Sequence, residues 1–191
     1  MRLFVGIEIS PAVITATIEL IAQLRAASAR LAPRSRITWV TAERLHITIR
    51  FIGHVDDRRV EKIRAVLAPP LAMDPFNLAI TGVGTSPPKG SPRVVWAGLA
   101  GGREQLRAIE STVSERLERA GVPREERPYN PHLTLARVRD AAGLPPAPFV
   151  GSLHDISLGT TSVDAITLFE SRGSPKGPTY VALARTPLIG T

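Results

Sequence analysis

Two kinds of apolar pattern alternate along the chain, and together they predict a protein built from strands and helices. Apolar residues that alternate with polar ones at a period of two are typical of a strand, whereas recurrence every three or four residues is typical of an amphipathic helix. The shorter period predicts strands over 2–10, 36–40, 43–53, 76–85, 93–99, 132–139, 162–170 and 179–185. The longer period predicts helices over 11–30, 57–67 and 103–120.

Proline and glycine mark the ends of these elements. Ser10 followed by Pro11 is typical of a helix start, and Gly121 is typical of the stop after the helix over 103–120. Two other segments, 84–92 and 141–148, are rich in proline. The first is predicted to be a surface loop and the second an irregular connection.

Two of the predicted strands carry the same polar pair inside an apolar run. His46 and Thr48 lie in Leu-His-Ile-Thr-Ile, and His132 and Thr134 lie in Pro-His-Leu-Thr-Leu. Alternation at a period of two places each histidine and its threonine on one face of its strand. The chain has four histidines, so half of them occur in this pattern.

The repeated pattern divides the sequence into two similar halves, each with a long helix, a His-x-Thr strand and a hairpin. A pseudo-twofold arrangement of these halves would bring the two strands together at one cleft. Two imidazoles and two hydroxyls would then surround one small anionic group. The simpler alternative is that each histidine only hydrogen-bonds its own threonine on a half-buried sheet.

Length and composition favour one compact unit. The 191 residues, of which 43% are hydrophobic, suffice for a single two-lobed domain over 1–191 and are too few for two comfortable independent domains. No apolar run approaches the roughly 20 residues that cross a bilayer, so we expect a cytoplasmic monomer that binds no membrane. The net charge of +7 favours an acidic partner such as nucleic acid or a phosphorylated small molecule. Cysteine is absent, which excludes disulfides and thiol nucleophiles.

A histidine pair of this kind can serve phosphodiester cleavage. Histidine titrates at roughly pH 6.5, so one imidazole can deprotonate an attacking water while the other protonates the leaving oxygen. Threonine hydroxyls and an arginine can hold the non-bridging oxygens. The sequence has no carboxylate cluster or His-x-x-x-His spacing that would bind a metal, so neither metal nor cofactor is expected. The residues by themselves leave the two histidine roles interchangeable.

The motifs His46-x-Thr48-Ile49-x-Phe51 and His132-x-Thr134-Leu135-x-Arg137 resemble the twin signatures of the two-histidine phosphoesterases. The context from Trp39 to Gly53 resembles the bacterial and archaeal RNA 2′,3′-cyclic phosphodiesterases, also called 2′-5′ RNA ligase-like proteins. Segments near 4–7, 94–99 and 169–180 fall in the family's order, so the resemblance covers nearly the whole chain.

The resemblance implies a bilobal, pseudo-twofold α+β fold, with an antiparallel sheet and helices in each lobe and the active cleft between the lobes. It implies that His46 is the proton donor and His132 the proton acceptor. Further implied site residues are the phosphate ligands Thr48, Thr134 and Arg137 and the base-stacking Phe51. The implied reaction opens a terminal 2′,3′-cyclic phosphate on RNA to a 2′-phosphomonoester without a cofactor, and some relatives also join RNA ends through a 2′-5′ bond.

Strand parity raises a problem for two of these residues. Phe51 and Arg137 each lie five positions after the histidine of their motif, so on a regular strand both point away from the cleft unless a bulge turns them in. The favoured interpretation of Phe51 is therefore a core position. A buried arginine without a partner is costly, which favours a functional Arg137. Arg50 shares the parity of His46 and is expected at a solvated strand end or against the RNA backbone.

Two other functions remain open at this point. The same chemistry could act on a small cyclic nucleotide, or the basic cleft could bind RNA without catalysis, in which case binding would survive loss of the histidines. His54 and His154 are expected in ordinary surface or turn positions. The loop over 85–92, with Lys89 and Arg93, is expected to be a plain connection, with closure over substrate as the alternative.

Overall fold

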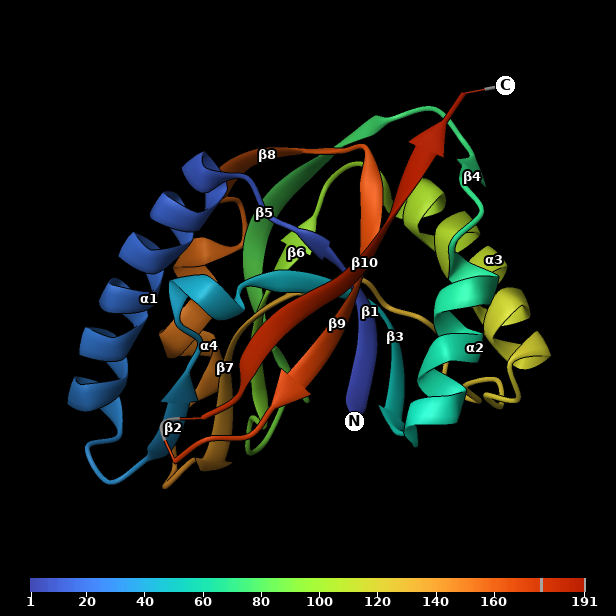
Figure 1. Ribbon diagram of the computed structural model, residues 1–191. Helices are drawn as coiled ribbons and strands as arrows, with labels where there is room; N and C mark the ends of the chain where they lie inside the picture. Colours follow the sequence, from blue (N-terminus) through green and yellow to red (C-terminus); the bar gives the residue numbers. More distant parts are fainter. Residues whose placement is uncertain (176, 191) are drawn as a thin grey trace.

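The computed structural model describes residues 1–175 and 177–190, and in this part of the chain ten strands form one mostly antiparallel sheet (Figure 1). The strands are β1 (Arg2–Glu8), β2 (Arg36–Trp39), β3 (His46–His54), β4 (Leu71–Ala72), β5 (Phe76–Ser86), β6 (Val94–Leu99), β7 (Leu133–Asp140), β8 (Ser157–Val163), β9 (Ala165–Arg172) and β10 (Thr179–Ile189). Their order is β4-β10-β9-β1-β3-β7-β6-β5-β8, with β2 paired to β7. The expected α+β class with antiparallel strands is confirmed.

Helices pack on this sheet in two separate groups. They are α1 (Pro11–Leu31), α2 (Asp57–Leu67), α3 (Arg103–Arg119) and the short α4 (Pro146–Val150), with two 3-10 turns, η1 (Ala42–Arg44) and η2 (Gly151–Leu153). Figure 1 shows α1 and α4 on one side and α2 and α3 on the other, and each of these pairs is in contact. α1 packs on β8 and α3 packs on β3, so the two groups of helices cover different parts of the sheet.

Local sequence explains where the long helices begin and end. Pro11 starts α1, because its fixed φ suits the first turn and its missing N–H is not needed there. The Asp56 carboxylate caps α2 by accepting a hydrogen bond from the Arg59 backbone N–H at 2.8 Å. α3 ends before Gly121, whose φ of +79° takes the chain into the left-handed region that favours glycine.

α1 corrects one expectation from the sequence. By length and composition this helix is apolar enough to cross a membrane, although no run of that kind was expected. In the fold Val13, Leu20 and Leu24 form its buried side, and α1 packs on β8 and α4. Its apolar character is thus accounted for by the face that covers the core.

Three elements were missed or misplaced in the sequence. The strand expected over 162–170 is two strands, β8 and β9, separated at Asp164, and the proline-rich segment 141–148 contains the start of α4. β8 is an edge strand beside β5 and buries few of its side chains, so its apolar pattern is weak. β4 has two residues, too few to show any period.

The two parts of the sheet meet where β3 pairs with β7. They do not correspond to the two halves of the chain. β9 and β10 pair beside β1, while α1 covers the part formed by β5 to β8. The expected division into an N-terminal and a C-terminal half is therefore wrong, because the chain crosses between the two parts of the sheet several times, but the expected neighbourhood of the two His-x-Thr strands is found.

Candidate functional site

The centre of the candidate site is the antiparallel pair Ile47–Leu133, which joins β3 to β7. Both side chains are fully buried. Continuing the register by one residue in each direction places His46 opposite Thr134 and Thr48 opposite His132. These four side chains are all partly exposed and lie on the face opposite Ile47 and Leu133. The two motifs therefore form one constellation with local twofold symmetry.

The two imidazoles are anchored in the same way. His46 Nδ1 lies 2.8 Å from the Arg44 carbonyl oxygen, and His132 Nδ1 lies 2.8 Å from the Asn130 carbonyl oxygen. A carbonyl only accepts, so each Nδ1 carries the proton and donates it. The tautomer is thereby settled for both rings, and Nε2 is the nitrogen free to exchange a proton with a substrate. His46 Nε2 lies 3.1 Å from Thr48 Oγ1.

Aromatic rings enclose His46. Its ring centroid lies 4.7 Å from that of Phe4 and 5.1 Å from that of Tyr180, which meets it edge-on. Burial lowers the pKa of His46, the hydrogen bond to the Arg44 carbonyl raises it, and the positive charges of Arg137 and His132 lower it further. The last two causes act through space, so Arg137 and His132 both lie within electrostatic reach of His46.

In each strand, one bulge between the histidine and the residue in question resolves the parity of Phe51 and Arg137. On β3, Thr48 pairs with Gly6 and Arg50 with Val5, so Ile49 is the extra residue. On β7, Thr134 pairs with Trp96 and Ala136 with Val95, so Leu135 is the extra residue. Each bulge reverses the alternation that follows it.

The reversed alternation changes where three side chains lie. Phe51 is 54% exposed, with its ring centroid 6.2 Å from that of Phe4, so the core interpretation of Phe51 is wrong. Arg137 is exposed and has the same face as Thr134. The side chain of Arg50, in contrast, is turned to the interior and is 6% exposed. The expectation that Arg50 lies in solvent or against RNA is therefore wrong.

Arg50 instead holds a loop that precedes the second motif. Its Nη2 donates to the Pro123 carbonyl oxygen at 2.5 Å, and Nη1 lies 3.5 Å from the Glu125 carboxylate. The Tyr129 hydroxyl donates to the Thr48 carbonyl oxygen at 3.0 Å. Segment 122–131 is thus tied to β3 at two points just before it delivers His132.

Tyr129 is a residue that sequence reasoning missed. Burial, reinforced by the Glu110 carboxylate, raises the pKa of its hydroxyl, so the hydroxyl keeps its proton at neutral pH and remains a donor. Its position three residues before His132 was the only signal, and nothing in the sequence pairs it with Thr48. The tie therefore became visible only in the fold.

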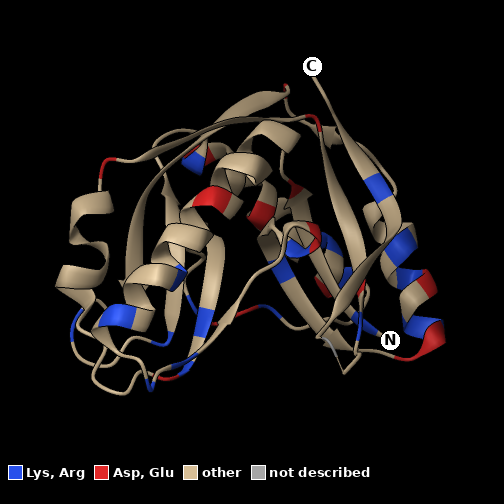
Figure 2. Ribbon diagram, turned by 90° about the vertical axis from the view of Figure 1, so that its left-hand side faces the viewer, with Lys and Arg blue, Asp and Glu red and all other residues tan. Residues whose placement is uncertain are grey.

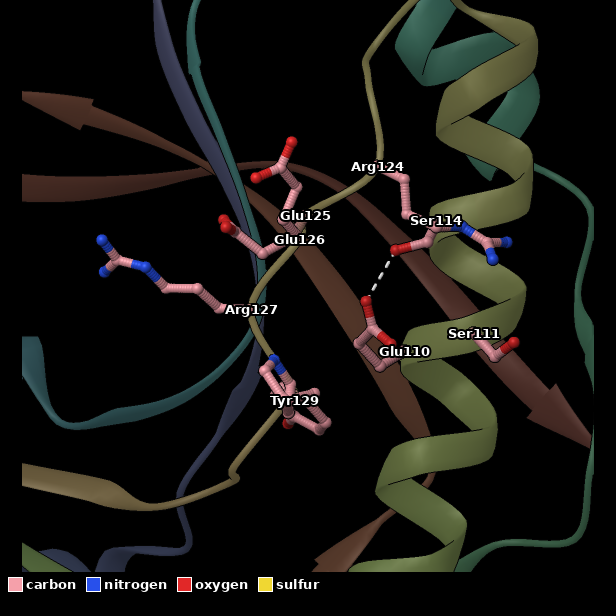
Figure 3. Close-up of a pocket in the computed structure, with 9 residues that line it drawn as sticks. Glu110, Ser111, Ser114, Arg124, Glu125, Glu126, Arg127 and Tyr129 are labelled. Atoms are coloured by element: carbon pink, nitrogen blue, oxygen red, sulfur yellow. Dashed lines mark hydrogen bonds between the residues drawn. The ribbon is translucent and has the colours of Figure 1, made fainter.

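A polar pocket of about 250 Å³ adjoins this tie and is distinct from the histidine pair (Figure 3). In Figure 3 Glu110 and Ser114 lie on the side of α3 nearer the loop, whereas Arg127 of the loop points away from the helix. Ser114 donates to Glu110 at 2.6 Å. The pocket is lined by Glu110, Ser111, Ser114, Arg124, Glu125, Glu126, Arg127, Pro128 and Tyr129. Neither His46 nor His132 lines it.

Trp96 is a second residue that sequence reasoning left without a role. It lies opposite Thr134 on β6, and its ring centroid is 6.5 Å from that of His132. The indole Nε1 donates to Ser86 Oγ at 3.0 Å. Trp96 therefore borders the histidine pair on the side opposite Phe51.

Other candidates lie outside the constellation. His54 is exposed at the end of β3, and His154 pairs with Asp155 at 2.8 Å after η2, as expected for surface positions. In the loop over 85–92, Lys89 is exposed, and Arg93 follows as an exposed residue before β6. Lys and Arg occur on strands, helices and loops of the molecule rather than on one element (Figure 2). Among residues 1–175 and 177–190 no three His, Asp or Glu side chains are grouped as a metal site.

Comparison with known proteins gives a consistent picture. The family model of the 2′-5′ RNA ligase superfamily matches residues 13–175. An RNA 2′,3′-cyclic phosphodiesterase of Aeropyrum pernix is 35% identical over 75% of this chain and 82% of its own length, and one of Archaeoglobus fulgidus is 32% identical over 94% and 96%.

Solved structures agree with the sequence comparisons. A protein of Thermus thermophilus superposes with a TM-score of 0.72 at 28% identity, over 100% of this chain and 99% of that one. E. coli LigT complexed with 3′-AMP superposes with a TM-score of 0.69 at 25% identity, over 98% and 97%. With its paired His-x-Thr strands, this chain belongs to the 2′-5′ RNA ligase superfamily.

Proposed function

We propose that this protein hydrolyses the terminal 2′,3′-cyclic phosphate of RNA to a 2′-phosphomonoester, using His46 and His132 as an acid–base pair. The observation that carries the proposal is the register of β3 on β7, in which each histidine faces the threonine of the other motif. Both imidazoles donate through Nδ1 to a carbonyl, which leaves both Nε2 atoms for the substrate. Two proton-transfer groups and two hydroxyls thus surround a space suited to one phosphate.

The reaction needs one proton taken and one given. His132 Nε2 accepts a proton from water as the water oxygen attacks phosphorus, and the bond from phosphorus to O3′ breaks. His46 Nε2 donates a proton to O3′, which leaves as the 3′-hydroxyl while the phosphate stays on O2′. Each of the two proton transfers contributes on the order of 10²- to 10⁴-fold in rate. The assignment of donor and acceptor follows the family resemblance.

The environment of His46 suits a donor only when phosphate is present. Its pKa is lowered by burial and by the neighbouring positive charges, so without a bound anion the ring is largely neutral at neutral pH. A phosphate beside Nε2 stabilises the imidazolium and also offsets the charge of Arg137. We infer that substrate binding causes His46 to take up a proton, which His46 then donates to O3′.

The remaining site residues hold the substrate. Thr48 and Thr134 donate their hydroxyls to non-bridging oxygens, and Arg137 counters the charge that grows on them in the transition state. Phe51, exposed beside Phe4, stacks on the terminal base. No cofactor or metal enters these steps.

RNA is the proposed substrate because the similar proteins of Aeropyrum and Archaeoglobus carry that activity in their names and the net charge is +7. A polyanion is attracted to such a surface. Both histidines come from one chain, so we propose that the monomer suffices. We also propose that it acts in the cytoplasm and binds no membrane.

The test is hydrolysis of an oligonucleotide ending in a 2′,3′-cyclic phosphate. His46→Ala and His132→Ala should each lose at least about 100-fold in kcat, whereas the exposed His54→Ala should match the unaltered protein. Activity should persist in EDTA. Appreciable turnover by either histidine variant, with folding retained, would rule out the acid–base pair.

Two further measurements separate the alternatives. Competition between the oligonucleotide and a cyclic mononucleotide distinguishes an RNA end from a small nucleotide as substrate. Salt-sensitive RNA binding without any hydrolysis, undiminished in both histidine variants, would instead identify a binding module.

A further inference from the structure

A groove with a volume of about 920 Å³ lies between α1 and β2, on the side of the sheet that α1 covers. We call it the α1–β2 groove. Its lining is mostly apolar and includes Ile18 and Ile21 of α1 and Ile37 of β2. Pockets that hold a drug-sized ligand measure roughly 300–1,000 Å³, so this groove has room for a ligand of nucleotide size.

Trp39 lies in the α1–β2 groove with its indole ring only partly covered. One part of the ring packs against the hydrophobic core, and the rest is open to the groove. On the α1 side of the groove, Ala22, Ala26 and Ala29 are all exposed, and their small side chains leave room beside the indole. A flat apolar group such as a nucleobase can therefore stack on Trp39.

The charge of the groove favours an anionic ligand. Arg25 of α1 and Arg44 of η1 line it, and the described residues contribute no Asp or Glu to the lining. The stretch over 20–42 carries four arginines and no acidic residue. An aromatic ring between cations is the combination that binds single-stranded nucleic acid, because bases stack on the ring while the cations follow the phosphates. A peptide would gain from these arginines only if it were acidic.

The groove adjoins the histidine pair at two points. The Arg44 carbonyl accepts from His46 Nδ1, and Thr38, which lines the groove, is paired with Arg137 on β7. Trp39 lies opposite Ala136 on β7, two residues beyond Thr134. At about 3.3 Å per residue, Trp39 is thus roughly 7 Å along β7 from the level of the reacting phosphate.

The path from the histidines to Trp39 crosses β2. Because β6 occupies one edge of β7, β3 and β2 follow one another along its other edge. Trp39 shares the face of the buried Ala136, so a strand that leaves the cleft must pass over the outer edge of β2. Among the described residues β2 pairs with β7 alone, which leaves that edge open to a ligand.

We propose that the α1–β2 groove binds single-stranded RNA just upstream of the cyclic phosphate end, with a base stacked on Trp39 and a phosphate against Arg25. The terminal base on Phe51 lies in the opposite direction along β3, so the two stacking positions do not compete. This inference rests on the proposed function and extends it: the preferred substrate is an oligonucleotide with an unpaired 3′ end rather than a cyclic mononucleotide.

The chain length of the substrate provides the direct test. For the unaltered protein, KM for a trinucleotide that ends in a 2′,3′-cyclic phosphate should be about 5- to 100-fold lower than KM for the cyclic mononucleotide, which is the gain from one stacked base. Trp39→Leu should remove most of this difference, and Trp39→Phe, which retains a ring, should keep part of it. Equal KM values for the two substrates in the unaltered protein would overturn the inference.

Salt dependence tests the role of Arg25. Each phosphate contact to a single strand contributes about −0.7 to the slope of log affinity against log salt concentration. Arg25→Gln should therefore make this slope shallower by about 0.7 for a trinucleotide 2′-phosphate, the reaction product. Arg107→Gln, exposed on α3 on the other side of the molecule, removes the same charge and should leave the slope unchanged. An unchanged slope in Arg25→Gln would contradict the proposed phosphate contact.

Fluorescence tests the stacking without turnover. The chain has two tryptophans, so Trp96→Phe leaves Trp39 as the single emitter. In this variant the trinucleotide 2′-phosphate should quench the emission at saturation, whereas adenosine 2′-monophosphate, which ends at the histidines, should leave it nearly unchanged. Equal effects of the two compounds would overturn the assignment of Trp39, and quenching by an acidic peptide alone would identify a protein partner instead.

The outcomes for the inference and for the proposed function are separable. If the unaltered protein hydrolyses neither the trinucleotide nor the mononucleotide, the proposed function fails, whatever the groove variants do. If both are hydrolysed with the same KM, only the binding of upstream RNA in the groove is lost.

Discussion

Ile47 and Leu133 are paired across the centre of the sheet, and neither side chain reaches solvent. This one pair determines the register of β3 on β7, because a slip of one residue would turn every following side chain to the other face. It therefore aligns the two polar pairs at the cleft. The buried residues of each motif are what hold the catalytic candidates in place.

The lowered pKa of His46 predicts a stability that depends on pH. The unfolded chain binds a proton at this imidazole near pH 6.5, whereas the folded protein binds it only at lower pH. Between these two values the unfolded state holds more protons, so the free energy of unfolding should fall as the pH drops through about 6.5 and level off below the folded pKa. Melting temperatures between pH 5 and 8 measure this fall.

The control for that measurement is a pair of variants. His46→Gln should reduce the acid-side loss of stability, while His54→Gln, at an exposed position, should leave the profile of the unaltered protein. An acid-side loss of the same size in His46→Gln would show that other groups cause it.

Arg137 should affect both phosphate binding and the titration of His46. Its charge lowers the pKa of His46, so Arg137→Gln should raise that pKa, as followed by NMR titration of the imidazole. The same variant should bind inorganic phosphate more weakly, because one charge-assisted partner is lost. Arg139→Gln, exposed two residues further along β7, serves as the comparison. An unchanged pKa in Arg137→Gln would place the two groups further apart than the fold indicates.

Gly6→Ala should disturb His46 from the neighbouring strand. A Cβ at position 6 would lie 3.2 Å from the Ile47 carbonyl oxygen, 3.3 Å from Phe4 Cε2 and 3.4 Å from His46 Cδ2. Because proton transfer is sensitive to small misplacements, kcat on a cyclic phosphate substrate should fall by about tenfold or more. The overpacking should cost about 1–3 kcal/mol of stability.

The matched control for this change is Gly151→Ala. A Cβ there meets open space, so activity and melting temperature should both be retained. Full activity in Gly6→Ala would mean that His46 tolerates the added methyl group by shifting without loss of function.

Tyr129→Phe should loosen the tie between the loop before His132 and β3. The change leaves the Thr48 carbonyl without the hydrogen bond at 3.0 Å, and an unsatisfied buried group costs about 1–3 kcal/mol. Urea denaturation should report this loss, and kcat should fall with little change in KM because His132 is less well positioned.

Tyr180→Phe provides the comparison for stability. Its hydroxyl has no hydrogen-bond partner among the described residues, so removing it should have little effect on the midpoint of denaturation. Equal midpoints for the two variants would argue that the Tyr129 hydroxyl contributes nothing to the loop.

Phe51→Leu tests whether Phe51 stacks on the terminal base of the RNA. Because Phe51 is 54% exposed, its loss should scarcely change the melting temperature. Removal of one stacked base should raise KM for a nucleotide substrate by about 5- to 100-fold. A loss of stability without a change in KM would return Phe51 to a structural role.

The sequence was informative wherever a short-range pattern carried the signal. The period of two around His46 and His132 correctly indicated strands with polar faces, and Pro11 and Gly121 marked helix ends, because these features depend on a residue and its immediate neighbours. For α1 the helix was predicted correctly but its apolar length was underestimated, since by length and composition it could cross a membrane, and its packing on β8 became known only from the fold. The apolar pattern did not indicate β4 and only weakly indicated β8, because each strand buries too few side chains to show a period.

The tertiary structure decided what depends on register. The extra residues Ile49 and Leu135 turn Phe51 and Arg137 toward the cleft and Arg50 away from it, and no local pattern in either strand marks a bulge. The hydrogen bond from Tyr129 to Thr48 likewise joins residues that are distant in sequence. The position of Trp96 opposite Gly84 depends on how β6 aligns with β5. The sequence by itself determined the chemistry of two histidines and two threonines. Only the fold decided which further side chains share their face, because a side chain's direction after a bulge depends on the neighbouring strand.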